Sequence, residues 1–567
     1  MKYQWIKPAA VNPSIIKNLT EETGLHPIVM SILYNRFYRS AKEIETFLRA
    51  DLDQLHDPFL FKEMQKAVER IIIALREGEN ILIYGDYDVD GVTGVSVLYD
   101  GLFKMGGKVS FFIPDRFEEG YGVSAEGIKK ARNRGTSLMI TVDCGITAVD
   151  EVAFASQSGI DTIICDHHEP GESLPAAVAV IDAKIKECPY PFKELAGCGV
   201  AFKLLQAIAE YLGTDPSFAN QYLDLVAIGT SADIVTLTGE NRVLVKHGLS
   251  MINENPRPGL FALMENCGMI GKELTVNKIV FVLAPRLNAV GRISNAKKAV
   301  HLLTTTSLQQ GKNISKILEK ENETRKNIDE VTFMEAQQLL DETIDLDKKR
   351  VLVIARENWH TGVIGIVASR LLEKMNRPTV LISIQDGVGK GSARSLPTFD
   401  IYEAFRKLDH LLINYGGHQY AAGLTISAEN IPVLDDALNQ IAEDDLVIEE
   451  MVPKLSIDAE VRFKDLDANF FNDLKAMAPH GPGNMRPVFV TSELCVFGNA
   501  SIVGHNHLKL KFKQDDVVID AIGYNLGDYL NQLKNARNIL DCAYVLEETR
   551  WSGQTTIQMR IRDLMIG

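Results

Sequence analysis

The sequence predicts a multidomain α/β protein that ends in a β-barrel. Three observations support this fold class. Apolar runs alternate with helical stretches between residues 81 and 165, the stretch 312–343 contains neither Pro nor Gly, and short alternating runs begin near residue 452. At 567 residues the chain has room for three or four domains of ordinary size.

The first predicted α/β unit contains a parallel sheet with helices on both faces. Short helices are expected before it, over residues 1–75. Helical stretches such as 92–105 and 147–157 separate its strands. The strands are expected at 81–84, 108–113, 138–142 and 162–165.

A long helix and a second α/β unit follow. The apolar positions of 312–343 leave a polar gap over 319–327, which is typical of a partly solvated linking helix. The second unit reads as a strand, a helix and another strand, at 351–355, 362–374 and 379–384.

From about residue 452 the short runs predict an OB-type barrel, a fold that binds single strands by charge and stacking. Lys509, Lys511 and Lys513 alternate with apolar residues in one run. Alternating lysines also protect edge strands from pairing with another chain, so both readings stay open. The runs are 454–457, 488–490, 508–513 and 517–522.

Three aspartates at alternating positions, Asp86, Asp88 and Asp90, follow the apolar run 81–84. Carboxylates two residues apart can converge at the carboxyl end of a strand, where open α/β sheets bind ligands. Hard oxygen ligands indicate a divalent cation such as Mg²⁺ or Mn²⁺. A solvated acidic turn is the alternative for these three residues alone.

Further acidic and histidine residues follow, or lie within, other apolar runs of the sequence. Asp143 and the trio Asp166, His167 and His168 each follow an expected strand, and Asp233 lies in a fourth apolar segment. Together with the three alternating aspartates, these clusters favour a metal site over a chance set of polar loops.

The order of these groups resembles the four motifs of the DHH phosphoesterase superfamily. Further segments are similar to the bacterial single-strand-specific 5′→3′ exonucleases of that superfamily, and the resemblance covers nearly the whole chain. In the similar stretch 478–485, His480 stands where Phe is usual and Met485 where Pro is usual, and neither departure touches the chemistry. The most similar segments are 83–91, 113–116, 119–122, 286–292 and 416–418.

The resemblance implies five parts: a helical lead-in, a parallel-sheet DHH catalytic domain, a linking helix, an α/β DHH-associated substrate-binding domain and an OB-fold nucleic-acid-binding domain. Their expected boundaries are, in that order, 1–75, 76–308, 309–346, 347–447 and 448–567.

The resemblance also implies two divalent metal ions, Mn²⁺ or Mg²⁺. The expected ligands are Asp86 and Asp88 for one ion, Asp90, His167 and Asp233 for the other, and Asp143 as a catalytic bridge. His168 would contact the scissile phosphate and stabilise charge in the transition state.

Contacts with the substrate are implied in the same way. Arg116, Ser392 and Arg394 would hold a 5′-phosphate, because arginine and hydroxyl donors suit a dianion. Tyr121 would stack on a base. The remaining expected contacts are Arg286, Asn288, Arg292 and Asn295 along the strand, Gly416, Gly417 and His418 near a phosphate, and Lys509 and Lys511 on the barrel. Apart from the resemblance, a Gly-Gly-His turn is an ordinary loop feature.

Composition narrows the class of protein. Seven scattered cysteines without a C-x-x-C pair argue against a disulfide framework or a zinc knuckle. Neither a leader nor an apolar run of about 18 residues is visible, so we expect a bacterial cytoplasmic protein outside the membrane. The net charge of −15 argues against a broad basic face, so we expect nucleic acid to bind in a narrow channel.

The expected function is a single-stranded-DNA-specific 5′→3′ exonuclease of DNA repair and recombination that uses two metal ions. We expect a monomer that cooperates with a helicase and a single-strand-binding protein. Two alternatives stay open: a DHH phosphodiesterase for oligoribonucleotides or cyclic dinucleotides, and a catalytically dead scaffold that binds single strands.

Overall fold

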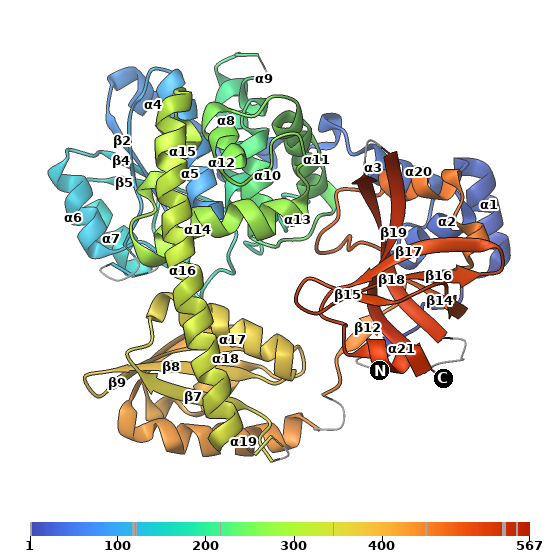
Figure 1. Ribbon diagram of the computed structural model, residues 1–567. Helices are drawn as coiled ribbons and strands as arrows, with labels where there is room; N and C mark the ends of the chain where they lie inside the picture. The colour runs from blue at the N-terminus through green and yellow to red at the C-terminus, as the bar shows by residue number, and fades with distance from the viewer. Residues whose placement is uncertain are drawn as a thin grey trace. The chain divides into compact units, whose positions relative to one another are not determined.

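The computed structural model describes residues 3–115, 119–120, 122–215, 217–343, 345–346, 348–447, 451–535, 540–551 and 554–566. The chain divides into two compact units. Figure 1 traces the chain from the N-terminus in blue to the C-terminus in red. The aspartate unit comprises Arg49–Glu330 and Pro479–Met485. The barrel unit comprises Met1–Leu48, Val331–Ala478 and Arg486–Gly567.

A five-stranded sheet in the order β3-β2-β4-β5-β6 forms the centre of the aspartate unit. All of its strand pairs are parallel. Their carboxyl ends therefore share one edge, where open α/β sheets bind ligands. The strands are β2 (Asn80–Gly85), β3 (Lys108–Phe112), β4 (Leu138–Val142), β5 (Asp161–Cys165) and β6 (Ala179–Ile181).

Helices cover both faces of this sheet, as the sequence predicts. Ile81 and Ile83 of β2 belong to one hydrophobic cluster, whereas Leu82 and Tyr84 belong to another. Because successive side chains of a strand point to opposite faces, the two clusters mark the two faces. The helices are α4 (Met64–Glu77), α5 (Val89–Lys104) and α8 (Gly197–Tyr211) in the first cluster and α6 (Ala125–Asn133) in the second, and α7 (Val149–Gln157) contributes to both.

The fourth apolar segment of the sequence is a helix, α10 (Leu223–Ala232), which Asp233 caps. An uninterrupted apolar run does not distinguish a buried strand from a buried helix. The other elements of this unit are η1 (Leu52–Gln54), η2 (Pro58–Leu60), α9 (Ser217–Asn220), α11 (Gly239–Glu254), α12 (Pro258–Asn266), α13 (Val276–Lys278), the π-helical turn η3 (Ile279–Leu283), α14 (Ala284–Ile293) and α15 (Lys297–Thr304).

The predicted linking helix is α16 (Leu308–Thr343), which begins in the aspartate unit and ends in the barrel unit. It is the long yellow-green helix of Figure 1. Within the described ranges, every helix is too short or too polar to cross a bilayer.

The barrel unit contains a second five-stranded sheet in the order β10-β11-β9-β8-β7. Only β7 and β8 pair in parallel, and the other pairs are antiparallel. Its elements are β7 (Leu352–Glu357), α17 (Thr361–Met375), β8 (Thr379–Gln385), β9 (Val388–Arg394), α18 (Ile401–Lys407), η4 (Asp409–Leu411), β10 (Leu412–His418), β11 (Ala421–Ser427), η5 (Ala428–Asn430) and α19 (Ile431–Asp445).

The C-terminal strands close into the predicted barrel. The sheet runs β13-β14-β18-β19-β17-β16-β15, and an additional β14–β16 pairing joins five of these strands into a ring. The elements are β12 (Lys454–Ser456), β13 (Ala459–Glu460), η7 (Phe463–Asp465), α20 (Ala468–Ala476), β14 (Phe489–Val496), β15 (Ser501–Val503), β16 (His507–Gln514), β17 (Val517–Gly523), α21 (Tyr529–Asn535), β18 (Leu540–Trp551) and β19 (Gln554–Ile566).

The helical lead-in divides between the two units. Residues up to Leu48 belong to the barrel unit, where β1 (Gln4–Ile6) pairs in parallel with β12. Met30 and Leu33 share one hydrophobic cluster with Phe470 and Phe489 of the C-terminal region. The N-terminal helices are α1 (Pro13–Thr23), α2 (Pro27–Asn35) and α3 (Ala41–Arg49).

Candidate metal centre and nucleic-acid contacts

The three alternating aspartates occupy the turn from β2 into α5. Asp88 is the N-cap of α5, and its side chain accepts a hydrogen bond from the Gly91 amide at 3.1 Å. A methyl group on Gly91 would lie 2.6 Å from the Asp86 carbonyl oxygen, so only glycine allows the helix to start this close to the strand. The turn thus gathers three carboxylates at the carboxyl edge of the sheet.

Asp90 is held by the N-terminus of a second helix. The amides of Gly197 and Cys198, at the start of α8, donate hydrogen bonds to the two carboxylate oxygens of Asp90 at 2.6 and 2.9 Å. Glycine at 197 also leaves room for Asp143, whose Cβ would lie 2.7 Å from a methyl group there. These amides were not predicted, and glycine at the start of a helix was the available signal.

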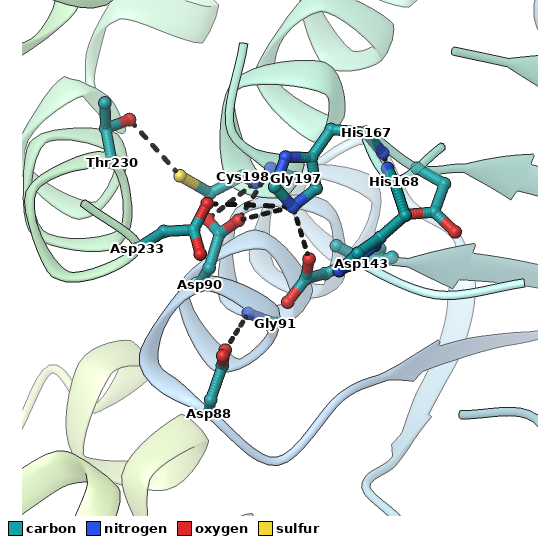
Figure 2. A network of polar contacts seen from close by, with 12 residues as sticks. Asp88, Asp90, Gly91, Asp143, His167, His168, Gly197, Cys198, Thr230 and Asp233 are labelled. Carbon is teal, nitrogen blue, oxygen red and sulfur yellow. Dashed lines mark hydrogen bonds and ion pairs between the residues drawn. The ribbon is translucent and has the colours of Figure 1, made fainter. Parts of the chain in front are cut away.

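Asp143 follows β4 in the left-handed region, with φ of 61°. Such a conformation is strained for a residue other than glycine, and strain of this kind gathers at functional sites. Nε2 of His167 lies 3.0 Å from the Asp143 carboxylate, 3.8 Å from that of Asp90 and 3.7 Å from that of Asp233. Figure 2 shows these three carboxylates around the His167 ring.

His168 is oriented by Asp166. The Asp166 carboxylate lies 2.7 Å from Nδ1 of His168, and it also accepts hydrogen bonds from the backbone amides of Ile146 and His167. Burial lowers the pKa of His168, but the hydrogen bond and charge of Asp166, with Asp90 and Asp88, raise that pKa above its usual value overall. Asp166 is thus a positioning residue, whereas the sequence analysis counted it in a polar cluster without giving it a role.

The structure brings all six predicted ligands together. Within the described ranges, each of three groups has ligand atoms that lie within 4.8 Å of one another and could hold a metal ion. The groups are Asp86 with Asp88 and Asp143, Asp90 with His167 and Asp233, and Asp143 with His167 and His168.

The electrostatics of this cluster suit a divalent cation. Burial and the charges of neighbouring aspartates raise the pKa of Asp143 and of Asp88, and raise the pKa of Asp233 to about 9. Burial lowers the pKa of His167, which keeps the imidazole in the neutral form that binds metals. Carboxylates that repel one another in a buried site are stabilised by a cation between them, so the donor set fits Mn²⁺ or Mg²⁺.

The comparisons with known proteins agree with this geometry. Residues 80–230 match the DHH family N-terminal domain, residues 348–444 the DHHA1 domain and residues 457–563 the RecJ OB domain. The single-stranded-DNA-specific exonuclease RecJ of Bacillus subtilis is 37% identical over 97% of this chain and 69% of its own length. RecJ of Escherichia coli is 31% identical over 95% of this chain and 96% of its own length.

The chain belongs to the RecJ family. Thermus thermophilus RecJ in complex with Mn²⁺ superimposes with a TM-score of 0.85 and 29% identity, over 100% of this chain and 80% of that one. The Mg²⁺ complex of the same protein gives a TM-score of 0.79 and 27% identity, over 99% and 78%. The predicted family and fold class are therefore confirmed.

Helix α14 packs directly on the aspartate turn. A methyl group on Gly291 would lie 2.6 Å from the Tyr87 carbonyl oxygen. The half-buried predicted contacts Asn288 and Arg292 lie on this helix, and Asn295 follows it and caps the amide of Lys297 at 3.0 Å.

Arg286, on the same helix, is engaged in an ion pair. Its guanidinium donates to both carboxylate oxygens of Glu319 and, at 2.7 Å, to the Val282 carbonyl. With its side chain 13% exposed, Arg286 fixes α14 to α16.

The five-stranded sheet of the barrel unit aligns four further predicted residues in two rows across β11. Ser392, Gly423 and Gly416 form one row, and Arg394, Ala421 and His418 form the next. The Arg394 guanidinium donates to Ser392 Oγ at 3.0 Å. Gly417 has φ of 141° and packs against β11, so this position requires glycine.

The N-terminal part of α17 lies against Ser392 and Arg394, the first residues of the two rows. A methyl group on Gly365 would lie 2.9 Å from Ser392 Oγ and 3.0 Å from Arg394 Nη2. Glycine at this position therefore leaves space for the guanidinium. Two other predicted contacts, Arg116 and Tyr121, lie outside the described residues.

The lysines of the RecJ OB domain lie on strand β16, opposite the barrel core. Lys509 and Lys511 are exposed and Lys513 is half-buried, whereas the residues between them are buried. β16 pairs with β17 along its length, with β15 at its start and with β14 at its end. It is therefore no open edge strand, which weakens the edge-protection reading. Phe497, 49% exposed, has its ring 6.0 Å from the Lys513 ammonium group.

Asp182, which follows β6, is a buried acid that the sequence analysis missed. Burial raises the pKa of its carboxyl to about 7, and the charge of Asp166 acts in the same direction. A lone aspartate after a three-residue strand gives a weak sequence signal.

Proposed function

We propose that this chain is a single-stranded-DNA-specific 5′→3′ exonuclease that hydrolyses phosphodiester bonds with two divalent cations, in DNA repair and recombination. The observation that carries the proposal is the pair of three-ligand groups, Asp86–Asp88–Asp143 and Asp90–His167–Asp233, side by side at one sheet edge. The relatives support it, since several RecJ proteins are named as exonucleases of this specificity.

The two groups would hold one ion each, with Asp143 shared because a carboxylate has two oxygens to offer. When bound, Mn²⁺ or Mg²⁺ polarises the scissile phosphate and acidifies the attacking water. The protein holds its ligands in place beforehand, through the amides that bind Asp90 and the strained backbone of Asp143. This arrangement reduces reorganisation during the reaction.

His168 would stabilise the negative charge that develops on the phosphate in the transition state. Asp166 accepts a hydrogen bond from Nδ1–H of His168, so Nε2 is the ring nitrogen that would face the substrate, and the raised pKa favours the protonated ring. A protonated imidazole donates a charge-assisted hydrogen bond to a phosphate oxygen, which stabilises the transition state.

Ser392 and Arg394 would bind the terminal 5′-phosphate. The guanidinium is already aligned by Ser392, so little side-chain entropy remains to be lost when a phosphate binds. The exposed Gly416, Gly417 and His418 lie on β10, which β11 separates from β9, and there a phosphate can approach the main chain. Arg116, which lies outside the described residues, is also proposed to bind this phosphate.

The rest of the bound DNA strand would follow α14 and the barrel. Asn288, Arg292 and Asn295 offer donors beside the aspartate turn, and Arg286 on the same helix is paired with Glu319. Tyr121 would stack on a base. On the barrel, Lys509 and Lys511 supply charge and the half-exposed Phe497 supplies a ring for stacking.

We further propose a bacterial cytoplasmic enzyme that works as a monomer, with a helicase that unwinds its substrate and a single-strand-binding protein that covers it. An enzyme limited to single strands depends on another protein to separate a duplex.

One assay tests the proposed activity. With Mn²⁺, oligonucleotides labelled at the 5′ end should release the labelled mononucleotide first from single strands, and duplexes should resist. Release of the 3′ nucleotide first would contradict the polarity. Preference for diribonucleotides or cyclic dinucleotides would indicate the other DHH activity, and binding without cleavage would indicate the scaffold.

A further inference from the structure

A short segment before β14 belongs to the aspartate unit, although the chain on both sides of it belongs to the barrel unit. This segment, Pro479–Met485, is called the clip. The clip lies against the residues that follow Asp233, from Thr236 to Arg242.

Backbone hydrogen bonds fasten the clip to this stretch. The Leu237 amide donates to the Pro482 carbonyl at 2.7 Å, and the buried Arg242 guanidinium donates to the Pro479 carbonyl at 3.2 Å. The clip is itself closed by paired backbone hydrogen bonds between Gly481 and Asn484 at 3.1 and 2.9 Å. It is therefore a preformed turn rather than a loose connection.

Two glycines let the clip approach closely. A methyl group on Gly481 would lie 2.6 Å from Cδ1 of Leu237, which is fully buried. Gly483 has φ of 72°, and a methyl group there would lie 3.1 Å from Thr238 Cγ2. Any side chain on either glycine would press on the stretch 236–238.

That stretch is one end of a short loop whose other end is the ligand Asp233. The Asp233 amide is tied to Gly229 of α10 at 2.9 Å, and Asn241 donates to the Thr236 carbonyl at 3.0 Å. Between these fixed points, Ile234 has φ of 63° and is 62% exposed.

A β-branched residue at positive φ is strained, and an exposed side chain gains little packing that could offset the strain. Such strain persists only where the surroundings determine the backbone. Here the C-cap of α10 fixes the loop on one side, and the clip with Asn241 fixes it on the other.

We propose that the clip is a positioning element for Asp233 and thereby sets the affinity of the Asp90–His167–Asp233 group for a divalent cation. This inference rests on the proposed metal site. Groups that orient metal ligands from outside the coordination sphere typically change metal affinity by about 10–100-fold when they are altered.

Calorimetric titration of the metal-free full chain with Mn²⁺ tests the proposal. Gly481→Val should weaken one of two bound ions by about 10–100-fold and leave the ion at Asp86–Asp88–Asp143 unchanged. The pair Gly481→Val with Leu237→Ala keeps the total number of side-chain carbons, because the valine takes the space that the leucine leaves. This double variant should regain most of the lost affinity.

Gly523→Val is the matched control, because a methyl group there would also meet a leucine, Leu526, at 2.9 Å, but within the barrel unit. It should leave both ions unchanged. If Gly481→Val does not fold, Gly481→Ala, which adds one carbon, is judged by the same criterion.

A folded Gly481 variant that binds both ions with wild-type affinity would overturn the role of the clip but not the proposed function. Equal weakening of both ions would overturn it as well, because the effect would then be general. A wild-type chain that binds no Mn²⁺ would overturn the proposed function and the role of the clip together.

Discussion

The Asp143 carboxylate lies 3.0 Å from Nε2 of His167, at the ends of the neighbouring strands β4 and β5. Asp143 belongs to the group with Asp86 and Asp88, and His167 belongs to the group with Asp90 and Asp233. Both residues also belong to the third group, with His168. The contact therefore joins the two halves of the candidate metal centre, and loss of Asp143 affects both.

Asp143→Ala should abolish turnover, because the two ions cannot be held at their spacing without a shared carboxylate. The fold should survive, since the substitution removes a buried carboxyl group whose charged form is disfavoured by burial and by the neighbouring aspartates. Nucleotide release with Mn²⁺ and circular dichroism measure the two properties. Normal Mn²⁺-dependent activity in this variant would refute the assignment.

When a chelator keeps the chain free of metal ions, its free energy of unfolding should fall as pH rises from about 5 to 8. The pKa of Asp233 is raised to about 9 in the folded chain, and those of Asp88 and Asp143 are also raised, whereas unfolded carboxyl groups titrate near pH 4. The folded state thus binds more protons than the unfolded state in this window, so stability is greatest at the acidic end and is lost as the groups ionise.

Urea unfolding at both pH values measures this effect. Asp233→Asn cannot ionise at that position and should lose less stability than the wild type, and saturating Mn²⁺ should reduce the loss in the wild type. Equal losses in the wild type and Asp233→Asn, without metal, would contradict the predicted shift.

His168→Ala should lower kcat by about 10²–10⁴-fold, the usual scale for loss of a charge-stabilising or acid–base group. The number of bound Mn²⁺ ions should stay at two. Because His168 also belongs to a possible ligand group with Asp143 and His167, calorimetry is the deciding measurement. Loss of one ion would make His168 a ligand instead.

Arg394→Ala should remove the preference for 5′-phosphorylated over 5′-hydroxyl single strands, because a charge-assisted pair contributes about 1.5–3 kcal/mol. Arg394→Lys, which keeps the charge but not the planar fork, should retain part of the preference. Competition assays with both substrates measure it. An unchanged preference in Arg394→Ala would place the 5′ pocket elsewhere.

Replacing Lys509, Lys511 and Lys513 with Ala should flatten the dependence of log affinity on log salt by about 0.7 per lost phosphate contact. Fluorescence anisotropy with a long oligonucleotide measures the slope, and light scattering reports self-association. Short substrates should be cut at nearly the wild-type rate. The charge-matched control replaces three exposed lysines elsewhere in the barrel unit, Lys17, Lys42 and Lys464. An unaltered slope with new aggregates would favour edge protection.

The sequence predicted four of the five strands of the first sheet, and the ligands at strand ends, because both signals are local; the three-residue β6 was not predicted. A buried strand is an uninterrupted apolar run, and Asp143 and His167 follow such runs directly. Asp233 was identified although its segment is helical, since the apolar run and the acidic residue carried the prediction rather than the type of element. The family resemblance supplied the grouping of the ligands.

Contacts between distant parts of the chain could not be predicted. The amides of Gly197 and Cys198 reach Asp90 across 107 and 108 positions, and backbone donors leave no mark in the side-chain pattern. The ion pair of Arg286 with Glu319 depends on how two helices pack. The division of the lead-in at Leu48 likewise depends on a barrel formed some 400 positions later.

The barrel is synthesised long after the N-terminal helices that pack against it. The apolar faces of α1 and α2, including Leu19 and Leu33, are buried with Phe489 and Leu564. At about 5–20 residues per second, a ribosome needs on the order of half a minute or more to reach those partners. These helices emerge long before their partners and thus wait with uncovered apolar surface while the aspartate unit folds behind them. This part of the nascent chain is consequently prone to aggregation and dependent on chaperones until the barrel is made.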